Sequence, residues 1–144
     1  MKNPTQPLAP PSDYPRCFNT QCPKAAECLR QLAAQQDDGN RTFLTAVNPK
    51  AIPPSPEACP HFKPARKVRL AWGVKNLFDT LPQKQAKVIK AEILRHFGRT
   101  KYYRIYRHET YMEPGEQEYI RKTFLRNGIR ENPVFDKYTE GYIW

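Results

Sequence analysis

No run in the 144-residue sequence approaches the roughly 20 apolar residues that a membrane-spanning helix needs. The start, MKNPTQPLAPPSDYP, also lacks the apolar segment of a secretory signal and is rich in proline instead. These two absences predict a cytoplasmic protein. Residues 1–15 are expected to form a disordered tail.

Common catalytic motifs are missing as well. The sequence contains no GxGxxG, no Walker loop, no HExxH and no GxSxG. Its three histidines, His61, His96 and His108, are far apart and have no neighbouring acid and nucleophile. The most basic part of the chain offers only Asp79 and Glu92 as carboxylates for a magnesium-dependent reaction. We therefore expect a protein that is not an enzyme.

Cysteine is scarce but unevenly placed, with the spacing Cys-x4-Cys-x5-Cys-x30-Cys. Two of the four thiols are followed by proline, and none belongs to a Cys-x-x-Cys redox motif. In a reducing compartment, clustered thiols favour metal binding over disulfides. Four thiolates suit tetrahedral zinc or an iron–sulfur cluster.

The sequence thus predicts a metal-binding module over residues 16–64. Zinc is favoured only slightly over an iron–sulfur cluster, because the spacing does not decide between them. His61 could replace one thiolate, while buried apolar thiols or a disulfide pair are the alternatives. The expected ligands are Cys17, Cys22, Cys28 and Cys59.

Acidic residues are few between Lys63 and Arg107, where two stand against thirteen Lys and Arg. This stretch carries a net charge of +11, whereas the whole chain carries +10. A one-signed field interleaved with aromatic residues favours a polyanionic partner over an ordinary solvated helix face.

The helical spacing of apolar residues and the positions of proline and glycine predict a mainly α fold. The expected architecture is a small helical bundle with a loop-rich, metal-stapled N-terminal half. A basic helical domain is expected over 65–130, followed by an aromatic C-terminal tail, 131–144, that packs on the body. A helical pattern begins at Arg66. The expected elements are a helix at 23–36, a short strand at 41–47, and helices at 82–98, 99–108 and 113–128.

The segment ILRHFGRTKYYRIYRHETYMEPGEQEYIRKTFLRNGI resembles the helix-turn-helix of phage-repressor-type DNA-binding proteins over roughly 83–129. Phe97-Gly98 would end the first helix, Arg99-Thr100-Lys101 would open the recognition helix, and Pro114 would begin the closing helix. His108-Glu109 stand where the family has a glycine. The resemblance implies a DNA-binding regulator. The whole chain is also similar to small Bacteroidota proteins of unknown function, which implies no activity.

The segment 99–108 also has strand propensity, although a helix is favoured. As a helix it would place Tyr102, Ile105 and Tyr106 against the bundle and a basic face outward. Lysine and arginine there can neutralise phosphates, and arginine can reach guanine edges. Duplex DNA is the favoured partner. The alternative is that this protein binds RNA, or that it is a protein-interaction adaptor stabilised by zinc. The expected nucleic-acid contacts are Arg99, Thr100, Lys101, Tyr103, Arg104, Arg107 and His108.

Overall fold

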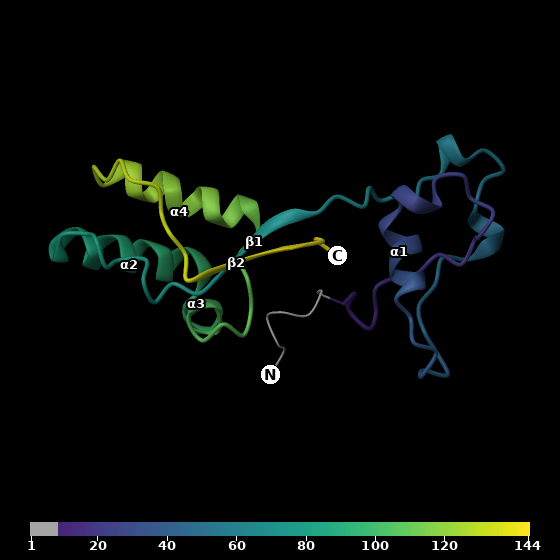
Figure 1. The fold of residues 1–144 in the computed structure, drawn as a ribbon, viewed down its shortest axis with the longest axis horizontal. Helices are drawn as coiled ribbons and strands as arrows, with labels where there is room; N and C mark the ends of the chain where they lie inside the picture. The colour runs from purple at the N-terminus through teal and green to yellow at the C-terminus, as the bar shows by residue number, and fades with distance from the viewer. Residues whose placement is uncertain (1–8) are drawn as a thin grey trace. The chain divides into compact units, whose positions relative to one another are not determined.

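The computed structural model describes residues 9–144 and divides them into two compact units (Figure 1). Of the described residues, the N-terminal unit contains 9–67 together with Tyr142–Trp144. The C-terminal unit is formed by Val68–Gly141. Most of the predicted tail, 1–15, lies outside the described residues.

The N-terminal unit contains one α-helix, α1 (Leu29–Gln35). Cys28, immediately before α1, has extended backbone, so the helix predicted at 23–36 starts six residues later and follows a short 3-10 turn, Ala25–Glu27. Two further 3-10 turns occupy Pro49–Ala51 and Pro56–Ala58. The remaining chain in this unit is loop, as its prolines require.

The strand predicted at 41–47 is wrong. Only Ala46 makes a bridge there, to Arg16. An apolar and β-branched segment forms a strand only where another segment lies beside it, and this one has a single bridging residue.

The C-terminal unit is built around a two-stranded antiparallel sheet of β1 (Val68–Trp72) and β2 (Lys137–Gly141). Val68 pairs with Gly141 and Trp72 with Lys137. On its other side, β1 exchanges two backbone hydrogen bonds with Met112, so β1 is covered along both edges at Ala71. The helical pattern predicted from Arg66 is therefore a strand at its start.

Three helices complete this unit: α2 (Gln83–Phe97), α3 (Arg99–Tyr106) and α4 (Pro114–Arg126). Figure 1 shows α2 and α4 side by side, with α3 next to α2. The helices predicted at 82–98, 99–108 and 113–128 are confirmed. Their shared core contains fully buried isoleucines, each worth about 1.5–3 kcal/mol relative to an exposed side chain. The central members are Ile89, Ile93, Ile105 and Ile120.

The helix ends follow local sequence rules. Gly98 alone joins α2 to α3 with φ +83° and ψ 155°, a region that only glycine occupies readily. Pro114 opens α4, where the Glu116 carboxylate accepts the backbone N–H of Glu113 in a capping box. At the other end, Gly128 has φ +80° and Ile129 N–H bonds to Phe124 C=O, which is a Schellman ending.

The predicted fold class is wrong in two respects. A sheet joins residues 65 to 73 positions apart in the C-terminal unit, so this unit is not a purely helical bundle. The N-terminal half is not stapled by a preformed metal site either. Within residues 9–144, no three or more His, Cys, Asp or Glu side chains lie close enough together to hold a metal ion.

Candidate functional site

The four cysteines line the wall of one cavity in the N-terminal unit, with a volume of about 620 Å³. All are free thiols; Cys28 is buried and the other three are partly exposed. His61 lines the same cavity. The structure therefore brings the predicted ligands to one place, although the sulfur atoms are not gathered around a common centre.

The cationic residues predicted to bind nucleic acid lie on α3 and just beyond it. Tyr102 and Ile105 are buried, as predicted, whereas Tyr106 is 39% exposed and does not seat the helix. Burial raises the pKa of Tyr102 to about 12, with smaller contributions from Tyr103 and Tyr106, so its hydroxyl is neutral. Arg99 and Thr100 are exposed at the first turn of α3.

Most of the predicted contacts already have an acidic partner. Lys101 pairs with Glu116, and Arg107 forms two hydrogen bonds with Glu109 at 2.7 and 3.3 Å. These bonds hold the pKa of Glu109 below its ordinary value. Arg104 also approaches Glu109, at 3.9 Å. The positive face of α3 is therefore largely neutralised, which the sequence signal at 99–108 did not show.

His108 is not a free basic side chain, because it is paired within the protein. Its Nε2 lies 3.0 Å from Asp136 Oδ2, and its φ of +60° places it in the left-handed region. His108 thus occupies a backbone conformation that glycine adopts most readily. The contact with Asp136 offsets the backbone strain, which costs of order 1–3 kcal/mol.

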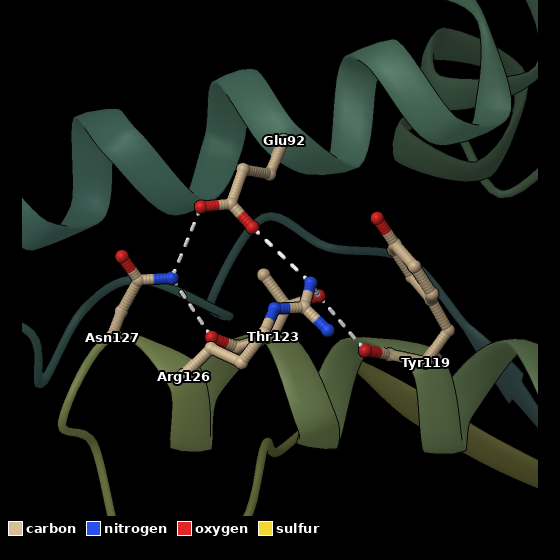
Figure 2. A network of polar contacts seen from close by, with 5 residues as sticks. All are labelled: Glu92, Tyr119, Thr123, Arg126 and Asn127. Atoms are coloured by element: carbon tan, nitrogen blue, oxygen red, sulfur yellow. Dashed lines mark hydrogen bonds and ion pairs between the residues drawn. The ribbon is translucent and has the colours of Figure 1, made fainter.

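Figure 2 shows how the acid of α2 is engaged on the side that faces α4. Glu92 accepts from Arg126 and from the Asn127 amide, both at 3.3 Å. Asn127 and Arg126 also bond to Thr123, through its carbonyl and hydroxyl oxygens at 2.9 and 3.0 Å. The only carboxylate of α2 is therefore engaged by residues at the end of α4.

The solvent side of α2 carries a set of exposed positions that was not predicted as a site. They follow helical spacing away from buried Ile89 and Ile93. Across the part of the chain that the structure describes, its three cations have no carboxylate partner within ion-pair distance. We call this set the outer face of α2: Lys84, Lys87, Val88, Ala91 and Arg95.

The signal for this face was present in the sequence as lysines at positions 84, 87 and 90, with Arg95 beyond. Whether these cations lack an acidic partner depends on where the Glu92 side chain points. Its direction is set by its contacts with the end of α4, which the sequence alone does not give. The face spans twelve residues, about 16 Å along the helix axis.

Comparison with known proteins assigns the chain to a family but to no activity. The model of a family of unknown function, DUF6078, matches residues 2–144, so the chain belongs to that family. No curated protein and no solved structure matches it. Within the described residues, no helix is both long and apolar enough to cross a membrane.

Proposed function

We propose that this protein is a non-enzymatic nucleic-acid-binding module that contacts duplex DNA through phosphates. The observation that carries the proposal is the outer face of α2, where exposed lysine and arginine stand without an acidic partner. A one-signed cationic helix face lowers the free energy of association with a polyanion by releasing condensed counterions.

The α3 residues form the second part of the proposed interface. Arg99 is exposed beside Tyr103, with its guanidinium 5.5 Å from the ring centroid. The exposed ion pairs of Lys101 and Arg107 are weak, because solvent screens them. Phosphate oxygens can therefore replace Glu116 and Glu109 as partners at small cost.

Duplex DNA fits the outer face of α2 better than single-stranded RNA does. Binding of unpaired bases relies on aromatic side chains that stack on them. This face has no aromatic residue; His96, the next residue on α2, stacks on Tyr119 with ring centroids 3.6 Å apart. Contacts with a regular phosphate backbone need only the cations. The predicted cytoplasmic location agrees with such a partner.

The test is fluorescence anisotropy with a labelled duplex of about 20 base pairs at low salt. Lys84→Ala/Lys87→Ala should weaken binding at least tenfold. The matched control is Lys122→Ala/Arg130→Ala, which removes two exposed cations elsewhere in the same unit and should change affinity less than twofold.

Two results would overturn the proposal. One is the absence of binding by the unaltered protein even at low salt. The other is an equal loss in both double variants, because a general effect of net charge would then explain the binding. Tighter binding of single-stranded RNA of the same length would replace duplex DNA as the partner.

A further inference from the structure

The thiol-lined cavity of the N-terminal unit has no part in the proposed DNA contact, yet its walls are built in an ordered way. Cys22 and Cys59 each begin a turn with proline in the second position, and each turn closes with a hydrogen bond to the cysteine carbonyl. The donors are Ala25 N–H at 3.1 Å and Phe62 N–H at 3.4 Å. Two turns of the same kind thus present a cysteine to the same cavity.

The two turns also contact each other. The Lys24 ammonium, from the first turn, lies 5.0 Å from the ring centroid of Phe62, from the second. A cation–π contact therefore links the turns of Cys22 and Cys59, which are thirty-seven positions apart in the sequence.

Cys17 and Cys28 are fixed to the same frame. Cys17 N–H bonds to the Arg30 carbonyl at 3.1 Å, while the Arg30 guanidinium bonds to the His61 carbonyl at 2.8 Å. Cys28 is bridged to Pro64, just beyond the second turn. Hydrogen bonds and a backbone bridge thus join the four cysteine segments.

One thiol already has a donor directed at its sulfur. Gln31 is 3% exposed; its side-chain amide donates to the Asn19 carbonyl at 2.5 Å and lies 3.7 Å from Cys17 Sγ. A buried N–H that points at sulfur stabilises a thiolate and is typical of the groups around metal-bound cysteines. Two cations, Lys24 and Arg30, also line the cavity.

We propose that this cavity takes up one soft divalent ion, Zn²⁺, through four thiolates. Each thiol releases its proton to solvent, and its sulfur then bonds to the ion at about 2.3 Å. The product carries a net charge of −2, which Lys24 and Arg30 balance. The sulfurs lie on the wall and move inward on binding. This is easiest for Cys17, Cys22 and Cys59, which are in loops and turns.

In this proposal the ion binds to a unit whose cysteine segments are also joined by hydrogen bonds. The proposal is independent of the DNA contact, which uses the C-terminal unit. Failure of either proposal leaves the other standing.

The test is a titration of the reduced full-length protein with Co²⁺, which reports its coordination by absorption. We expect intense visible bands of a tetrahedral ion and thiolate charge-transfer bands in the near ultraviolet. These should saturate at one ion per chain and disappear on adding Zn²⁺. Cys22→Ser and Cys59→Ser should each weaken binding by more than about tenfold.

The matched control is Phe18→Ser, which alters the cavity wall at a residue that is 51% exposed and leaves every thiol in place. Its titration should equal that of the unaltered protein. The proposal is overturned if Co²⁺ produces no charge-transfer bands, or if both cysteine variants bind it as tightly as the control. Circular dichroism of each variant establishes that the unit is folded.

Discussion

His108 Nε2 lies 3.0 Å from Asp136 Oδ2, and this contact joins the end of α3 to the residue just before β2. The same carboxylate accepts the backbone N–H groups of Lys75 and Asn76 at 3.0 and 2.9 Å. One side chain therefore fixes three segments of the C-terminal unit.

The stability of this unit should depend on the charge of Asp136. Burial raises the pKa of Asp136, but hydrogen bonds from His108 and from the two amides outweigh it and leave the pKa below the ordinary 3.8. Since the folded-state pKa is depressed, the stabilisation is present above the ordinary pKa and is lost as the pH falls through the folded value. Asp136→Asn should lower the free energy of unfolding by about 2 kcal/mol at neutral pH.

The measurement is urea unfolding of both proteins between about pH 7 and pH 2. The difference between them should shrink once the pH falls below about 4. Asp79→Asn, at an exposed carboxylate outside this contact, is the control. A difference that does not change with pH would show that the charge of Asp136 is not the cause.

Glycine substitutions should separate backbone strain from steric conflict. Gly73 has φ +79°, and a Cβ there would lie 2.1 Å from His108 Nε2 and 2.2 Å from Asp136 Oδ2. Gly73→Ala should therefore cost about 3 kcal/mol or more, and Gly98→Ala, with an open surrounding, about 1–3 kcal/mol from backbone alone. Gly115→Ala, in α4 with free space, should be neutral or stabilising. Thermal unfolding checks the order, and equal losses at Gly73 and Gly98 would contradict the packing of His108 over Gly73.

The link between α2 and α4 should be weak but measurable. A double-mutant cycle on Glu92→Gln and Arg126→Gln should give a coupling of about 0.5 kcal/mol, because the Arg126 side chain is 54% exposed. High salt should reduce it. A cycle on Glu92 and Lys122 serves as the control and should show no coupling, whereas equal values would mean that Glu92 feels only the general charge of α4.

The cysteines should differ in reactivity when no metal is added. Cys28 is 7% exposed, while Cys17, Cys22 and Cys59 are partly exposed. A thiol reagent such as dithiobisnitrobenzoate should therefore modify three thiols quickly and the fourth slowly. Mass spectrometry identifies the slow residue, and four equal rates would contradict the burial of Cys28.

The helices of the C-terminal unit could be predicted because their limits are local. Pro82 and Gly98 bound α2, and Pro114 and Gly128 bound α4. The sheet could not be predicted, since the pairing of Val68 with Gly141 is a contact between distant residues and the segment also fits a helical pattern. The residues of β1 form a strand because β2 lies beside them and pairs with them.

For the candidate sites, the sequence predicted which residues belong together but not how their side chains pair. The sequence indicated that the four thiols belong together, and they do line one cavity. It did not reveal that Glu109 and Glu116 neutralise the basic face of α3, because side-chain pairing across α3 and α4 depends on tertiary packing. The outer face of α2 became evident only when Glu92 was seen to point at α4.

The central claim is that cations of the C-terminal unit bind DNA phosphates. The most direct test is the affinity for a labelled duplex measured at several salt concentrations. If Lys84, Lys87, Arg95 and Arg99 each contact a phosphate, log K should fall against log salt with a slope of about −3.6. The slope of Lys84→Ala/Lys87→Ala should be shallower by about 1.8. A salt-independent affinity, or an unchanged slope in that variant, would contradict the account.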